Sequence, residues 1–244
     1  MIKLIKYHMK SFLSSNRYIM PLLVYIIILA MLCSSTVTSV KAVYIFSMVV
    51  AYFVATWSGF IYADSEDHIT EQILILKSRS NIKYYISKIL FVVIWGMLYA
   101  GISFVVPIFW RIFELIIKDN KFSDMNIEIV CISLFVHICI VMLGSIIGYL
   151  LHPRVFKNRK IGAIATFSLS VIGIIKGPLF EEFKLSAFKI LSWLLPPVYE
   201  IIQGCNLETN GLKFSNVILP CILAVIYSCI LATINVFAIN KRGF

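Results

Sequence analysis

Charged residues are scarce in this chain of 244 residues. Only 14% of the residues are charged, 60% are hydrophobic, and the mean hydropathy is +0.93. Soluble domains have about a quarter of their residues charged, so this composition excludes an ordinary soluble domain. The sequence therefore predicts a membrane protein.

Several motifs that carry chemistry are also missing. The six cysteines show no C-x-x-C spacing and no His-rich tract accompanies them, so we expect small packing residues and no metal site. There is no G-x-x-x-x-G-K-[ST] stretch to hold a nucleotide phosphate. The net charge of +10 comes from basic residues beside apolar runs, without a basic face. We predict a protein that is not an enzyme, binds no cofactor and has no nucleic-acid partner.

Long apolar runs dominate the chain instead. Five of them approach the roughly 20 residues that a helix needs to cross the hydrocarbon core. A sixth run, Ile161–Ile175, is short and is followed by Lys176, so a span here either thins the bilayer locally or continues towards Phe180 with the lysine snorkelling. We predict an all-α polytopic membrane protein with six transmembrane helices, at residues 20–40, 43–62, 89–110, 129–151, 161–178 and 217–239.

The basic residues predict the orientation of these spans. In a six-span topology, fourteen of the 22 Lys and Arg residues fall on the side that holds both chain ends. That side also holds the tightest basic clusters beside the spans. By the positive-inside rule, we expect both termini in the cytoplasm.

Two further segments are predicted at the membrane surfaces. Residues 1–18 place Ile2, Ile5, Met9 and Phe12 at helical spacing, which predicts an interfacial amphipathic helix; the alternative is a basic flank that only orients the first span. Residues 179–216 contain an apolar run before Pro196-Pro197 and predict a helical segment that dips into the outer leaflet. If that segment instead spanned the membrane, the last span would be reversed.

The most polar segment, residues 65–88, joins the second and third spans. Asp64 or Ser65 can cap a helix whose first turns are acidic. Ile69, Ile73, Leu74 and Leu76 give this helix an apolar face, and the stretch from Lys77 to Asn81 ends it. A helix that projects into the cytoplasm predicts a protein-binding element; the alternative is a plain connection between two spans.

The loop has a pattern that carries a resemblance. It reads E-x-x-x-x-E-Q-x-L-x-L-K-S-R-x-x-x-x-Y-x-x-S-K from Glu66 to Lys88. Together with the layout of the whole chain, this loop resembles type-2 ABC transporter permeases, in particular those of peptide and lantibiotic export or immunity systems. The resemblance implies that a coupling helix at about Asp67–Leu76 docks in an ATP-binding subunit. The implied coupling residues are Glu66, Asp67, Glu71, Gln72, Leu74, Leu76, Lys77 and Arg79.

The same resemblance implies the partners and the cargo. A second permease subunit would complete a homodimer or heterodimer, and the separate ATP-binding subunit would hold ATP and Mg²⁺. The substrate would be an amphipathic peptide, such as a bacteriocin, or a lipid-like molecule. The location would be a bacterial cell membrane.

Three features inside the predicted spans bear on packing and shape. Gly144 and Gly148 form a G-x-x-x-G motif, which serves either packing within the chain or a dimer face. Pro107 and Pro220 are expected to kink their helices. Charges are nearly absent from the span centres; His137 is the main exception, and we interpret it as a hydrogen-bonded packing residue in preference to a proton relay.

Two other classes of membrane protein compete with this interpretation. A secondary transporter or channel is expected to carry carboxylates inside its spans, and these are nearly absent. Glu181-Glu182 resembles the start of the E-E-x-x-x-R motif of glutamate-type intramembrane proteases. However, Ser186 stands where that motif needs arginine, and His137 precedes the glutamates instead of following them.

Overall fold

The computed structural model describes residues 1–34, 40–65, 68–78, 80–118, 127–150, 158–182, 194–205 and 214–241. All regular elements within these ranges are helices. They are α1 (Ile2–Ser14), α2 (Ile19–Ser34), α3 (Val40–Ala63), α4 (His68–Ser78), α5 (Asn81–Lys118), α6 (Ile127–Leu150), α7 (Arg159–Glu182), α9 (Val198–Gly204) and α10 (Phe214–Lys241).

Five of the described helices, α3, α5, α6, α7 and α10, are long and apolar enough to cross a membrane. The count rises to six if α1 and α2, which meet at a bend of 77°, are taken together as one span. The chain is therefore a multi-pass helical membrane protein. Six separate spans, as the sequence predicts, are not established.

The uncertain span is the first one and not the fifth. The predicted span 161–178 lies within α7, which continues past Lys176 to Glu182 and passes the criteria for a membrane helix. The predicted span 20–40 contains 15 of the 16 residues of α2, which is about 24 Å long against a hydrocarbon core of about 30 Å. Residues 35–39, over which that span was predicted to continue, lie outside the described ranges.

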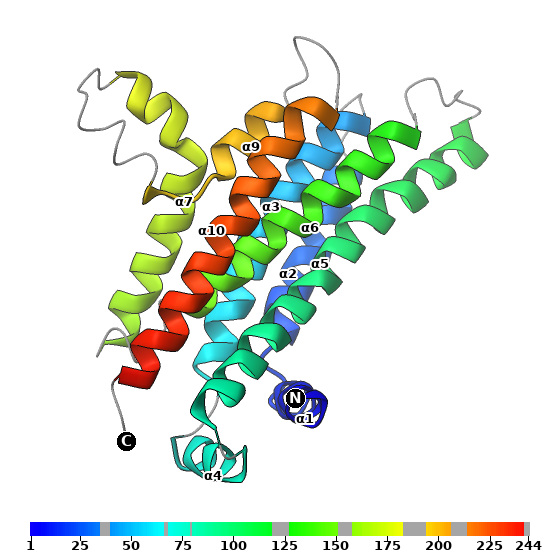
Figure 1. The fold of residues 1–244 in the computed structure, drawn as a ribbon. Helices are drawn as coiled ribbons and strands as arrows, with labels where there is room; N and C mark the ends of the chain where they lie inside the picture. Colours follow the sequence, from blue (N-terminus) through cyan, green and yellow to red (C-terminus); the bar gives the residue numbers. More distant parts are fainter. Residues whose placement is uncertain are drawn as a thin grey trace.

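The helices form one bundle with two distinct ends. In Figure 1, α3, α5, α6 and α10 run side by side, α1 and α4 lie across one end, and α9 caps the other. We call these ends the α4 end and the α9 end. The last turn of α10 lies at the α4 end, the same end as α1. The two chain ends thus approach the same end of the bundle.

The pair α3 and α6 forms the centre of the bundle. A β-carbon at Gly144 would lie 2.6 Å from the backbone oxygen of Tyr52, and one at Gly148 would overlap the backbone oxygen of Thr56. On the α3 side, a β-carbon at Gly59 would lie 2.5 Å from the backbone oxygen of Ser145. The G-x-x-x-G motif therefore packs within the chain, which decides between its two interpretations.

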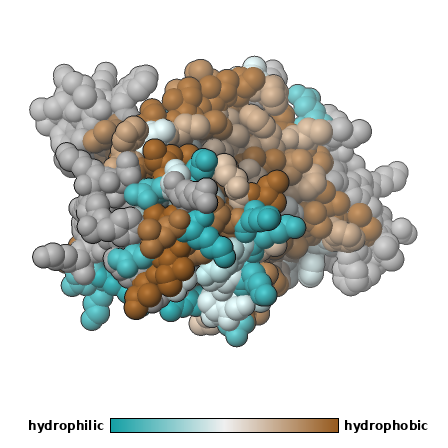
Figure 2. Space-filling model, turned by 60° about the horizontal axis from the view of Figure 1, so that its bottom comes forward, coloured by the Kyte–Doolittle hydropathy of each residue, from teal (hydrophilic) through white to brown (hydrophobic). Residues whose placement is uncertain are grey.

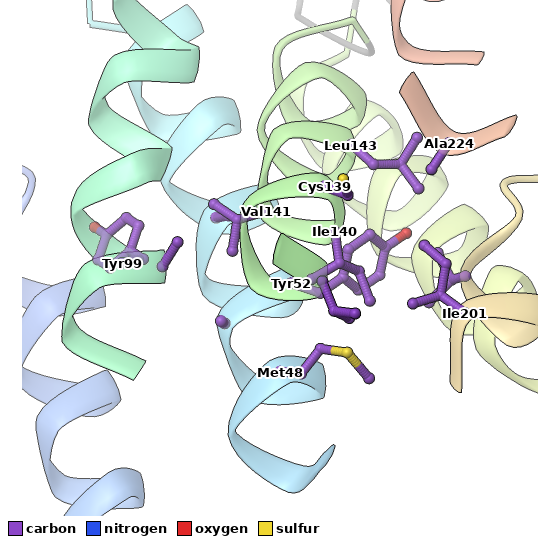
Figure 3. Packing of buried hydrophobic residues seen from close by; sticks show 14 of the residues in the cluster. Met48, Tyr52, Tyr99, Cys139, Ile140, Val141, Leu143, Ile201 and Ala224 are labelled. Carbon is purple, nitrogen blue, oxygen red and sulfur yellow. The ribbon is translucent and has the colours of Figure 1, made fainter. Parts of the chain in front are cut away.

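Large side chains fill the space around this close contact. Met48 and Tyr52 of α3 lie against Ile140 of α6, and Ile201 of α9 and Ala224 of α10 belong to the same buried cluster (Figure 3). The short helix α9 is thereby part of the core, although it is too short to span a membrane.

The amino-terminal helix α1 is attached to the bundle through one part of its predicted apolar stripe. Phe12 is buried, and its ring packs edge-on against the rings of Tyr62, Phe91 and Trp95. Ile2 and Met9 remain exposed. Phe12 is therefore a core residue, whereas Ile2 and Met9 keep the outward position that an interfacial helix needs.

Two predicted boundaries differ from the structure. The helix α5 begins at Asn81 and has 38 residues, about 57 Å, so the predicted loop 65–88 ends near residue 80 and the predicted span 89–110 is only the middle of α5. The predicted outer segment 179–216 begins inside α7 and includes α9, which follows Pro197. It also includes the start of α10 at Phe214. Residues 183–193 and 206–213 of that segment lie outside the described residues, so its position in the membrane stays a prediction.

Three prolines lie beyond the first turn of a described helix. Pro107 is in α5 and Pro220 in α10, where kinks were predicted, and Pro178 is in α7. All three helices continue through their prolines. The kinks at Pro107 and Pro220 stay a prediction.

Candidate functional site

The helix α4 lies beyond the span helices, at the end of the bundle and beside α5 (Figure 1). It covers His68–Ser78, close to the predicted Asp67–Leu76. The hydroxyl of Ser78 donates to the backbone oxygen of Ile75, at 2.9 Å, within the last turn. The hydroxyl oxygen of Ser80 accepts from the backbone nitrogen of Lys83, at 3.4 Å, in the first turn of α5. Local serine contacts thus separate the two helices where the sequence predicted a break.

A buried ion pair fastens α4 to α5. The Nζ of Lys88 lies 3.3 Å from Oε1 of Glu71, and the two side chains are only 5% and 3% exposed. The Lys88 ammonium also lies 4.9 Å from the centre of the Tyr84 ring. Charges so deeply buried are tolerated only with a partner, so the pair fixes the position of α4 on α5.

Apolar contacts support the same attachment. Ile75 of α4 forms a small buried cluster with Tyr84 and Tyr85 of α5. Leu4 of α1, Leu74 of α4 and Val236 of α10 pack against this cluster. The inner face of α4 therefore packs on α5, within a cluster to which α1 and α10 also contribute.

The opposite face of α4 carries large apolar residues with no cover in the described structure. Ile69, Ile73 and Leu76 are 66%, 58% and 78% exposed, and their spacing of four and three residues places them on one face of the helix. We call these three residues the α4 outer stripe. Figure 2 views this end of the molecule and shows apolar surface among hydrophilic surface. A contiguous exposed apolar surface of this kind is typical of an interaction site.

The residues predicted to couple α4 to a partner divide between its two faces. Leu76 and Lys77 are exposed, Gln72 is half-buried, and Glu71 and Leu74 face the bundle. Glu66, Asp67 and Arg79 lie outside the described residues. Any role of Glu71 and Leu74 in coupling would accordingly act through the position of α4.

Sequence reasoning did not single out Lys88, Ile69 and Ile73 as site residues. The isoleucines had a detectable signal, because they continue the helical spacing of Leu76. Lys88 had none, because its partner is 17 residues away on another helix.

A second set of charges joins three segments at the α4 end. Asp64, just after α3, lies 2.8 Å from Arg159 of α7 and 3.6 Å from Arg17, which lies between α1 and α2. Arg17 also donates to the backbone oxygen of Asp64 at 3.0 Å. Asn16 turns the chain there with a φ of 53°, a conformation that asparagine tolerates well. The partly exposed pairs contribute little energy each, but they define where α7 begins.

His137 lies inside the bundle with partners at both ring nitrogens. Its Nδ1 lies 2.7 Å from the backbone oxygen of Ser133 and must donate to it, and its Nε2 lies 3.0 Å from the Ser47 hydroxyl. This geometry matches a hydrogen-bonded packing residue.

A third polar contact lies at the α9 end. Lys176 of α7 is almost fully buried, and its Nζ lies 2.7 Å from Oε1 of Glu200 on α9. Lys176 does not snorkel to solvent, as its place near the end of a span suggested; it is neutralised within the protein. The pair joins α7 to the cap of the bundle.

The described part of the chain contains no cluster of three or more His, Cys, Asp or Glu side chains able to hold a metal ion. All six cysteines are described, and none of them is in a disulfide. Comparison of the chain with protein-family models, with curated proteins and with solved structures finds no match.

Proposed function

We propose that this chain is the membrane-spanning subunit of an ATP-driven ABC exporter, with α4 as the helix that docks in a separate ATP-binding subunit. The observation that carries this proposal is the division of α4 into two faces. The inner face is fixed by the Glu71–Lys88 pair, and the outer stripe presents Ile69, Ile73 and Leu76 to a partner. A mere connection between two spans needs neither feature.

The geometry suits transmission of a movement from α4 into the bundle. A partner that closes around ATP changes the contacts of α4, and a conformational change requires such differential contacts in the two states. Since α4 is held on α5, a displacement of α4 passes to a helix about 57 Å long. That helix packs against α3 and α6 at the centre of the bundle.

The remaining parts of the proposal concern the assembly. ATP and Mg²⁺ are bound by the partner, and a second permease subunit completes the transporter. The cargo is an amphipathic peptide such as a bacteriocin, or a lipid-like molecule, for which an apolar path between helices is suitable. The α4 end faces the cytoplasm of a bacterial cell.

The orientation gives the first prediction. In a cysteine-free background, single cysteines at positions 16 and 240 should react with a membrane-impermeant maleimide only after the cells are permeabilised. Cysteines at positions 120 and 206 should react in intact cells. Labelling of position 240 in intact cells would contradict a cytoplasmic α4 end, since α10 ends there together with α1.

The outer stripe gives the second prediction. Replacing Ile73 and Leu76 together with aspartate should reduce co-purification of a co-expressed ABC ATP-binding subunit by at least about tenfold, because carboxylates buried in an apolar groove cost several kcal/mol. Insertion should be unchanged, since both side chains are exposed in the chain itself.

Leu194→Asp provides the matched control. Leu194 is 71% exposed but lies near α9, so its substitution should leave the capture of the ATP-binding subunit unchanged. If the double variant of α4 binds the ATP-binding subunit as well as the native chain does, the proposed docking role of the outer stripe is wrong.

A further inference from the structure

A groove at the α9 end lies between α7, α9 and α10. Its volume is about 440 Å³, within the range of about 300–1,000 Å³ that is usual for small-molecule sites. It is lined by Lys176, Leu195, Pro197, Glu200, Leu223, Ile226, Tyr227 and Ile230. Six of these residues are apolar or aromatic, and the two charged ones form the ion pair described above.

The ion pair leaves polar capacity unused. A lysine ammonium has three N–H donors, and the described structure gives the Lys176 ammonium a single acceptor, Oε1 of Glu200. The other carboxylate oxygen of Glu200, Oε2, is itself buried and receives no hydrogen bond from any described residue, although the side chain as a whole is 41% exposed. Buried polar atoms in proteins almost always have partners. This end of the groove therefore offers both a donor and an acceptor to a ligand.

The polar and apolar parts of the groove are arranged in depth. Lys176 lies four residues, about 6 Å, before Phe180, where the apolar span of α7 ends. Leu223, Ile226 and Ile230 follow one another on one face of α10 and continue towards the middle of the bundle. Ile226 and Ile230 are half exposed, so the groove is open towards the bilayer. The charged residues thus lie near the membrane boundary and the apolar residues lie deeper. A lipid molecule has the same arrangement, with a charged headgroup at the boundary and apolar chains below it.

We propose that this groove binds a phospholipid whose headgroup carries both a phosphate and a primary ammonium, as in phosphatidylethanolamine. The phosphate accepts from the free N–H groups of Lys176, and the ammonium donates to Oε2 of Glu200 after a small rotation of the carboxylate. One acyl chain lies along Leu223, Ile226 and Ile230. Phosphatidylcholine has no N–H to donate, and phosphatidylglycerol offers Glu200 only neutral hydroxyl groups, so neither makes a charge-assisted hydrogen bond to both groups.

Lipid binding to the whole purified chain tests the proposal. In native mass spectrometry with phosphatidylethanolamine, phosphatidylcholine and phosphatidylglycerol of identical acyl chains, the first should bind about tenfold more tightly, the effect of one charge-assisted hydrogen bond. Glu200→Gln should abolish this preference. Equal binding of the three lipids by the native chain would overturn the proposal.

A second variant tests the apolar part without touching the ion pair. Ile226→Trp should block the acyl chain and lower phosphatidylethanolamine binding, and an unchanged affinity would overturn the proposed position of the chain. Ile218→Trp is the matched control, because Ile218 is an exposed residue of α10 outside the groove. This variant should bind phosphatidylethanolamine as tightly as the native chain does. Glycerophosphoethanolamine, which lacks acyl chains, should not compete; full competition would make this a headgroup site and contradict a lipid site.

Discussion

Replacing Gly148 with alanine should destabilise the bundle by about 2 kcal/mol or more, which is in the range for overpacking a close contact. The added β-carbon would overlap the backbone oxygen of Thr56 and lie 3.0 Å from the backbone nitrogen of Phe60. Backbone atoms cannot turn aside as a flexible side chain can, so α3 and α6 would have to separate. The measurement is thermal unfolding of the detergent-purified chain, followed by tryptophan fluorescence.

Gly101→Ala is the matched control. Gly101 lies in α5, and a β-carbon there meets nothing within 4 Å. Alanine favours a helix over glycine by up to about 1 kcal/mol, so this variant should be as stable as the native chain or slightly more stable. If Gly148→Ala unfolds at the native temperature and only weakens self-association, the motif is a dimer face and the α3–α6 contact is not as close as the structure has it.

The apolar runs could be predicted well, because hydropathy depends on composition along the chain. Hydropathy was less informative where a charge interrupts a run. Lys176 made the run from Ile161 appear short, but Glu200 neutralises the lysine from another helix, and α7 continues. In α2 the run is apolar enough for a span, and the described helix covers 16 residues of the chain there.

Partners in packing could not be predicted from the sequence. The G-x-x-x-G motif indicates that some helix approaches closely, but the spacing of Gly144 and Gly148 does not say which one. Gly59, which lies opposite them on α3, has no motif around it and was not singled out. Only the arrangement of the bundle brings the three glycines together.

The two faces of α4 were assigned only in part. Its helical spacing predicted an apolar face, and Ile69, Ile73 and Leu76 lie together as that spacing requires. Glu71 was expected to contact an ATP-binding subunit, as the resemblance implies. It is buried because Lys88, which the sequence places at the start of a span, lies on the first turns of α5 and reaches it.

The Glu71–Lys88 pair allows the strongest test of how α4 is held. Glu71→Gln keeps the shape of the side chain but removes the negative charge that lies 3.3 Å from the buried Lys88 ammonium, and breaking a buried ion pair costs about 3–5 kcal/mol. We expect α4 to detach before the bundle unfolds, because the pair lies outside the α3–α6 core. Hydrogen exchange of the α4 amides should become much faster, while exchange in α6 should change little. Lys77→Gln is the control on the same helix, since Lys77 is exposed, and its effect should stay within about 0.5 kcal/mol.

A double substitution separates the position of α4 from its charge. Glu71→Leu with Lys88→Met removes both buried charges, and exchanging a buried ion pair for apolar residues is often neutral or stabilising. Hydrogen exchange of the α4 amides should therefore become slow again. If α4 acts as a rigid docking helix, capture of the ATP-binding subunit should return with it, because the outer stripe is intact. Restored protection without restored capture would show that Glu71 contacts the partner directly. If the α4 amides exchange as slowly in Glu71→Gln as in Lys77→Gln, the ion pair does not hold α4. The proposed transmission of movement from α4 to α5 is then wrong.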